Sequence, residues 1–178
     1  AMKENRVSAG MSVPPVTGES SLMYFIDRLE KAHAAPFDEH ILLVHECCMT
    51  EEGTEAVKKV MNHPYVALCP CSNIFIHNAL PPVDMIRRSG IKITVGTDSL
   101  SSNDDLDMVR ELFCLQENFP QVPLGEMIFW ATANGADFLG KGDVYGKMLP
   151  GMKPGLVFID HLSENGYLTT ASVSQRII

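Results

Sequence analysis

Three short apolar runs, separated by segments of helix length, constrain this chain more than any other feature of its sequence. The runs cover residues 40–45, 65–69 and 91–95. Continuous apolar runs of this length are typical of strands that are buried on both faces of a parallel sheet. Strands that alternate with helices also favour parallel pairing through right-handed crossovers. The sequence therefore predicts an α/β fold.

The segments around these strands predict amphipathic helices. A helix capped by Ser20 or Ser21 is expected to end near His33, and a second helix is expected to begin at Thr50 and stop before Pro64. Serine, asparagine and proline after the second strand indicate a loop up to residue 81. Further helices are expected at 82–88, 104–118 and 124–139, and residues 1–19 are expected to form a loop.

The character of the sequence changes after Gly140. Glycine and proline become frequent there, and short strands are expected at 156–160, at 167–169 and in the last stretch before Ile178. We therefore divide the chain into an α/β part, residues 1–140, and a β-rich C-terminal tail, residues 141–178.

Charge, hydropathy and cysteine content indicate which binding partners and which cellular compartment to expect. The formal net charge is −8 and no stripe of lysine and arginine exists, which argues against nucleic acid and anionic membrane surfaces as partners. No stretch approaches the roughly 20 apolar residues of a membrane helix, and the first residues lack the apolar core of a signal peptide. The five cysteines, an odd number, indicate reduced thiols and a cytoplasmic protein.

Polar residues stand where each of the three predicted strands ends: His45, Cys69 and Asp98. The carboxyl ends of parallel strands face the ligand site in α/β folds. Imidazole is a good zinc ligand or proton shuttle, and a carboxylate can bind metal and accept a proton from water. The pattern is that of a metal-dependent hydrolase. Taken alone, Asp98 could equally be a helix cap or loop hydrogen-bonder, and a histidine such as His45 is more often a structural polar residue under a loop.

Two other kinds of site are weaker predictions. The cysteines could be imagined around a structural zinc ion, but Cys69 and Cys71 lack the two intervening residues of the usual ligand pair. The segment 96–99 could bind phosphate at a helix N-terminus, but no lysine or second glycine follows at the spacing of a P-loop.

Several motifs in order carry a family resemblance over roughly residues 40–160. The segments are 42–45, 68–73, 80–83, 90–99, 102–108 and 151–160. Together they resemble the amidohydrolase superfamily, in particular its branch of guanine, cytosine, adenosylhomocysteine and chlorotriazine deaminases or chlorohydrolases. The resemblance implies the C-terminal part of a TIM-like (β/α)8 barrel, about strands six to eight with their helices, followed by a short tail of β-sandwich type.

The resemblance also implies roles for individual residues. Asp98 would bind metal and accept a proton from the nucleophilic water, and His45 would contact the water or substrate, or bind a second metal. Cys69, Ser72 and Asn73 would line the substrate side of the loop after strand seven. The implied reaction is hydrolysis of a carbon–nitrogen bond, in particular deamination of a nitrogen heterocycle, with zinc or iron as the metal.

The departures from the family pattern are as informative. No two of the six histidines stand two residues apart, so the His-x-His pair of the family's first strand is absent, and the fifth-strand histidine is also missing. The residues at 3–6 could fall just after that fifth strand. A full barrel needs roughly 250 residues, more than the 178 here.

We therefore expect a C-terminal portion that is inactive and binds no metal by itself. Two open sheet edges should also promote a homo-oligomer. The alternative is a non-catalytic α/β fragment that works through self-assembly or through a complementing partner.

Overall fold

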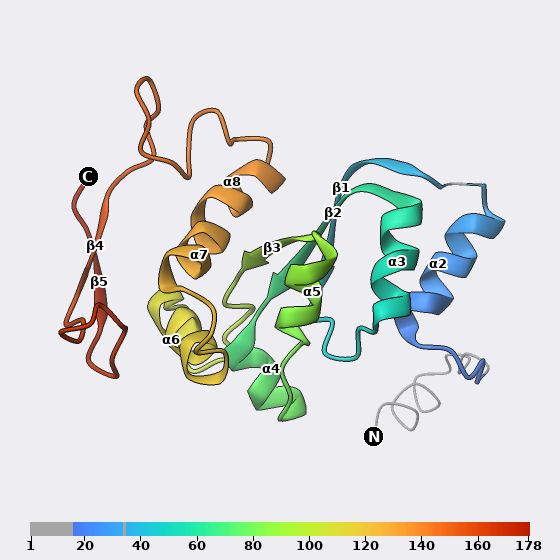
Figure 1. Cartoon of the computed structure of the whole chain (residues 1–178), viewed down its shortest axis with the longest axis horizontal. Coiled ribbons are helices and arrows are strands. Elements are labelled where there is room, and N and C mark those ends of the chain that lie inside the picture. The colour runs from blue at the N-terminus through green and yellow to red at the C-terminus, as the bar shows by residue number, and fades with distance from the viewer. Residues whose placement is uncertain (1–15, 34) are drawn as a thin grey trace.

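The computed structural model describes residues 16–33 and 35–178, and a parallel sheet of three strands lies at the centre of the molecule (Figure 1). Its order is β1–β2–β3, with β1 at Phe37–Val44, β2 at Met61–Leu68 and β3 at Lys92–Val95. Helices connect the strands, so the predicted α/β class is confirmed. The expected loop at 1–19 and the comparison drawn for residues 3–6 lie largely outside the described residues.

Two strands begin earlier than predicted. β1 starts at Phe37 rather than His40, and β2 starts at Met61 rather than Tyr65. The added residues include exposed polar side chains, so they do not belong to the apolar runs that marked the strands. Pairing of Phe37 with Met61 shows that the parallel ladder continues beyond the apolar runs, and β1 itself is largely half-buried or exposed rather than buried on both faces.

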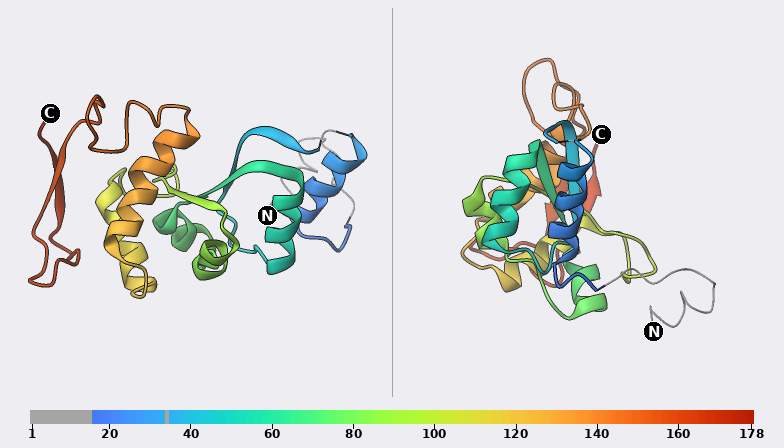
Figure 2. Two further views of the ribbon diagram at one scale, coloured as in Figure 1. Left: turned by 45° about the horizontal axis from the view of Figure 1, so that its top comes forward. Right: turned by 90° about the vertical axis from the view of Figure 1, so that its right-hand side faces the viewer.

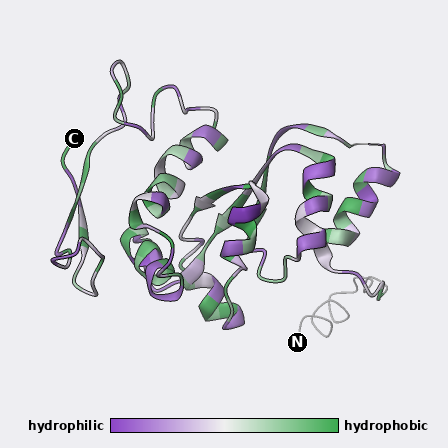
Figure 3. Ribbon diagram, viewed as in Figure 1, coloured by the Kyte–Doolittle hydropathy of each residue, from purple (hydrophilic) through white to green (hydrophobic). Residues whose placement is uncertain are grey.

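Three amphipathic helices lie around one end of the sheet: α2 (Ser21–Lys31), α3 (Glu51–Val60) and α5 (Val83–Ser89). The hydroxyl groups of Ser20 and Thr50 accept hydrogen bonds from backbone N–H groups in the first turns of α2 and α3, as the sequence predicted. Hydrophobic and hydrophilic residues alternate along both helices (Figure 3). Helix α3 packs on β2, where Val66 and Leu68 are fully buried, and α2 packs on α3.

The prediction of a loop directly after Cys69 was wrong. Helix α4 spans Pro70–His77 and ends at Asn78, which has a left-handed backbone. Proline is well tolerated at the first position of a helix because the N–H group that it lacks has no partner there. The serine and asparagine that suggested a loop occupy the first turn of this helix.

The fourth predicted helix, at 104–118, begins later than expected. Helix α6 spans Met108–Asn118, whereas a start at Asp104 was predicted. The carboxylate of Asp107 accepts a hydrogen bond from the N–H of Val109, 2.8 Å away, and caps the helix there. The last predicted helix is observed as α7 (Leu124–Phe129), a π-helical turn η1 (Trp130–Asn134) and α8 (Gly135–Phe138).

The tail contains an antiparallel hairpin of β4 (Val157–Asp160) and β5 (Val173–Arg176), which confirms two of the predicted strands. It stands at the end of the molecule opposite α2 (Figure 2). Residues 167–169 form no strand, contrary to prediction. The side chain of Gln116 bonds both the N–H and the C=O of Leu168, at 2.9 and 3.0 Å, and occupies the groups that a ladder would need.

Within the described part of the chain, no helix is long and apolar enough to cross a membrane. The boundary proposed at residue 140 stays a prediction.

Candidate active site

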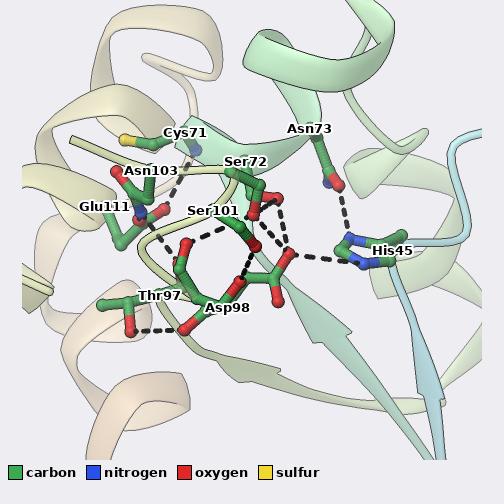
Figure 4. Close-up of polar contacts among 11 residues, drawn as sticks. His45, Cys71, Ser72, Asn73, Thr97, Asp98, Ser101, Asn103 and Glu111 are labelled. Carbon is green, nitrogen blue, oxygen red and sulfur yellow. Dashed lines mark hydrogen bonds and ion pairs between the residues drawn. The ribbon is translucent and has the colours of Figure 1, made fainter. Parts of the chain in front are cut away.

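The polar side chains that follow β1 and β3 meet at the carboxyl end of the sheet (Figure 4). Nε2 of His45 lies 3.8 Å from Oδ2 of Asp98, and each side chain keeps about a third of its surface exposed, 33% and 30%. β2 lies between β1 and β3, so this approach depends on both residues leaning over the end of the middle strand. The structure thus brings together the two residues that the sequence proposed as metal ligands.

The backbone at both positions is left-handed, which is uncommon for residues other than glycine. The φ angles are 72° for His45, 50° for Glu46 and 57° for Asp98. The N–H of His45 donates to the carbonyl of Ala67 on β2, so the turn is tied to the sheet. Residues in such conformations concentrate at functional sites, where the surrounding structure holds them in place.

Two serine hydroxyls hold the carboxylate of Asp98. Ser72 and Ser102 donate to Oδ2 over 2.7 and 2.8 Å, and the two hydroxyl oxygens lie 2.9 Å from each other. Both serines are buried. Their hydrogen bonds, the one from Ser72 first, hold the pKa of Asp98 below its ordinary value. Asp98 is therefore kept as a carboxylate, the form that binds metal or accepts a proton.

Asn73 orients His45. Its Oδ1 lies 2.7 Å from Nδ1 of the imidazole, which assigns the proton to Nδ1 and leaves the lone pair of Nε2 facing Asp98. Asn73 is fully buried, and its Nδ2 has no hydrogen-bond partner among the described residues. A buried donor without a partner is costly, so this atom marks a place where a bound group could accept a hydrogen bond.

A buried carboxylate that the sequence reading missed lies behind these residues. Glu111, on α6, is 1% exposed. Its Oε2 accepts a hydrogen bond from the N–H of Cys71 at 3.0 Å, and its Oε1 accepts one from the side chain of Asn103 at 2.6 Å. Burial raises the pKa of Glu111, although these hydrogen bonds oppose the rise. Its place three residues after Met108 and four before Leu115, both apolar and on the same face of α6, was the signal that could have revealed it.

Cys69 is buried beneath the site rather than open to it. The residue is 4% exposed, and burial, with the nearby charges of Asp98 and Glu111, raises the pKa of its thiol to about 12. All the cysteines are free thiols. Among residues 16–33 and 35–178, no three histidine, cysteine, aspartate or glutamate side chains are arranged to hold a metal.

The donor atoms fit one side of a metal site. A carboxylate and an imidazole with a free lone pair are both zinc ligands, and a zinc ion takes about three or four protein ligands. His45 and Asp98 supply two. The polar partners behind them, Asn73 for the histidine and two serines for the aspartate, are of the kind that orients metal ligands. The described residues therefore fit part of a ligand set.

A groove of about 460 Å³ opens beside His45. It lies between the first residues of α2, the turn after β1 and the end of α4. Its lining is mixed, with apolar side chains, hydroxyls, thiols and one carboxylate: Ser20, Ser21, Leu22, Val44, His45, Glu46, Cys47, Cys48, His77 and Ala79.

Comparisons with known proteins identify the family of this chain. The family model described as "Amidohydrolase family" matches residues 17–176. The 5-methylthioadenosine/S-adenosylhomocysteine deaminase of Desulfitobacterium hafniense is 32% identical over 130 residues, which are 70% of this chain and 30% of that protein. The 5'-deoxyadenosine deaminase of Methanobrevibacter smithii is 26% identical over 168 residues, 85% of this chain and 38% of that protein.

Solved structures support the fold. An adenosine deaminase from Xanthomonas campestris with bound zinc aligns with a TM-score of 0.65 at 23% identity, covering 89% of this chain and 39% of that one. Helicobacter pylori aminofutalosine deaminase in complex with methylthio-coformycin aligns with a TM-score of 0.56 at 25% identity, covering 64% and 28%. The chain thus spans between a quarter and two fifths of the length of these similar proteins.

Proposed function

This chain belongs to the amidohydrolase family, a family of hydrolases, and on that premise we propose that it supplies one part of a metal-dependent deaminase active site. In this proposal its strands β1, β2 and β3 are strands six to eight of a (β/α)8 barrel. The remaining ligands would come from sequence outside the 178 residues, on the same or another polypeptide. The observation that carries the proposal is the approach of His45 and Asp98 at the carboxyl end of the sheet.

The proposed reaction is hydrolytic deamination of a nitrogen heterocycle, with the purine nucleosides named for the relatives as the first candidates. Water adds to the ring carbon that bears the amino group, and ammonia leaves. His45 and Asp98 would hold zinc or iron on one side. The metal, when bound, lowers the pKa of the attacking water.

Asp98 is suited to move the proton. Its pKa is held low by Ser72 and Ser102, so the carboxylate is ionised and can accept a proton from the attacking water. It can then pass this proton to the departing nitrogen. Oδ2 accepts the hydrogen bonds of the two serines, and Oδ1 is the oxygen that we assign to this transfer.

Where His45 does not bind the metal, its protonated form is suited to donate a hydrogen bond from Nε2 and so stabilise the charge that develops on the attacking oxygen or on the ring. Asn73 fixes the plane of its imidazole, so Nε2 cannot turn away from the site. The unpaired Nδ2 of Asn73 supports a direct contact with substrate, as the sequence reading proposed for this residue. Ser72 acts through Asp98 in this proposal, and Cys69 shapes the floor of the site.

Complementation tests the proposal. The chain is co-expressed with the part of the Desulfitobacterium hafniense deaminase that the match leaves uncovered, and ammonia release from 5'-deoxyadenosine, methylthioadenosine and S-adenosylhomocysteine is measured. We expect turnover with the wild-type chain and none with Asp98→Asn. Assembly of the two parts into a complex that holds metal yet releases no ammonia would contradict the proposal.

A second candidate is a non-catalytic role through self-assembly or through a partner. It is supported by large apolar side chains exposed near the carboxyl end of the sheet, such as Val44, Phe75 and Leu106. β1 and β3 also have one strand partner each within the described residues. Light scattering on the purified chain distinguishes the candidates, since a monomer across the micromolar range argues against self-assembly.

A further inference from the structure

The buried carboxylate of Glu111 joins two segments that the sequence separates widely. One is the first turn of α4, where Cys71 donates its N–H to Oε2. The other is the loop after β3, where Asn103 donates from Nδ2 to Oε1 and from the same nitrogen to the carbonyl of Thr97. Figure 4 shows Glu111 on the side of this network remote from His45.

Each of these segments carries residues of the proposed site. The first turn of α4 holds Ser72, which bonds Asp98, and Asn73, which bonds His45. The loop after β3 holds Asp98 itself and Ser102. A group that ties the two segments together therefore governs how the carboxylate and the imidazole lie relative to each other.

We infer that Glu111 is a positioning residue of this site: through Cys71 and Asn103 it sets the placement of Asp98 and His45. The inference deepens the proposed function and rests on it for its consequence in catalysis. Neither Asp98 nor His45 is among the hydrogen-bond partners of Glu111, so Glu111 acts only through the first turn of α4 and the loop after β3.

The chemistry of the contact explains why a carboxylate is needed. Both oxygens face N–H donors, so two acceptors are required at fixed separation. Glutamine has the same shape but carries one acceptor and one NH2 group. Whichever way it is turned, it points a donor at the donor of either Cys71 or Asn103. A carboxylate buried to 1% exposure is also costly, which a merely space-filling residue would avoid.

The test compares Glu111→Gln with Glu117→Gln, which removes a carboxylate from the exposed face of the same helix. Two signals are followed by NMR on the labelled chain. The first is hydrogen-exchange protection of the Cys71 amide, and the second is the pair of ring-nitrogen shifts of His45. In Glu111→Gln we expect protection of Cys71 to fall by about tenfold or more. The His45 ring shifts should also move, while Glu117→Gln changes neither signal.

Two results would overturn the inference. If Cys71 loses protection but the ring nitrogens of His45 are unchanged, Glu111 supports the start of α4 without positioning the site. If Cys71 keeps its protection, the hydrogen bond to Glu111 is not made in solution. Neither readout uses substrate or metal, so failure of the complementation assay leaves this result intact and the two proposals fail separately.

A second variant covers the case in which Glu111→Gln does not fold. Asn103→Ala keeps the bond between Glu111 and Cys71 and removes only the link to the loop after β3. We expect the amide signals of residues 97–99 and the ring signals of His45 to move in this variant. Unchanged signals in a folded Asn103→Ala protein would overturn the inference by themselves.

Discussion

Oδ2 of Asp98 lies 3.8 Å from Nε2 of His45, although the two residues follow strands that are not neighbours in the sheet. The contact exists because parallel strands deliver their carboxyl ends to one edge, and because both residues adopt a left-handed backbone there. Ser72, Ser102 and Asn73 then fix the two side chains from α4 and the loop after β3.

Removing the hydroxyl of Ser72 should raise the pKa of Asp98 towards its ordinary value, because the largest stabilising hydrogen bond to the carboxylate is lost. Ser72→Ala should also lower the free energy of unfolding by about 1 kcal/mol. Carbon-13 NMR titration of the Asp98 carboxyl measures the first effect. Ser101→Ala is the matched control, since Ser101 bonds Ser99 and not Asp98. Equal titration curves for both variants would argue against the hydrogen bond between Ser72 and Asp98.

The acid limb of stability should depend on Asp98. A carboxyl whose pKa is lowered in the folded protein stabilises it above the unfolded pKa, here taken as the ordinary value of 3.8, and this contribution is lost as the pH falls through the folded pKa. The stability difference between wild type and Asp98→Asn should therefore shrink from about pH 7 to about pH 3, by no more than about 1 kcal/mol for so exposed a group. Urea unfolding at each pH measures the free energy of unfolding of both proteins. A difference between them that increases as the pH falls would contradict the prediction.

The chain by itself should retain little metal. His45 and Asp98 offer two ligands, fewer than the about three or four of a zinc site. Elemental mass spectrometry after dialysis should find well below one zinc or iron per chain. Added Zn²⁺ should bind weakly by calorimetry, and Asp98→Asn should abolish that binding. Near-stoichiometric metal that survives in Asp98→Asn would mean that ligands lie elsewhere, with the cysteines as the first place to look.

Gly146 should be among the least replaceable positions of the tail. Its φ is 85°, and a Cβ atom there would lie 2.8 Å from Cα of Ala133 and 2.9 Å from the carbonyl oxygen of Thr132. Gly146→Ala should cost about 1–3 kcal/mol beyond the left-handed strain of about 1–2 kcal/mol. Gly166→Ala, with φ 76° and open space around it, isolates the strain alone. Equal melting temperatures for the two variants would show that the tail does not pack on η1.

Much of the fold could be predicted because local patterns report it directly. The apolar runs marked the buried parts of β1, β2 and β3, and the caps at Ser20 and Thr50 marked two helix starts. Helix α4 was missed because its first turn is built from residues that also favour loops. The start of α6 was misplaced because Asp104 and Asp107 are both good caps, and only the bond from Val109 selects the second.

The sequence by itself determined the class of fold, the family, and the identity of Asp98 and His45 as the chemically able residues at two strand ends. Only the tertiary structure decided that these two side chains face each other and that Asn73, on α4, orients the imidazole of His45. It also placed the buried carboxylate of Glu111 behind them. The physical reason is the range of the interactions. Strands and helices can be predicted from patterns among residues that are close in sequence. Hydrogen bonds between α4, α6 and the loop after β3 form only when packing brings distant segments together.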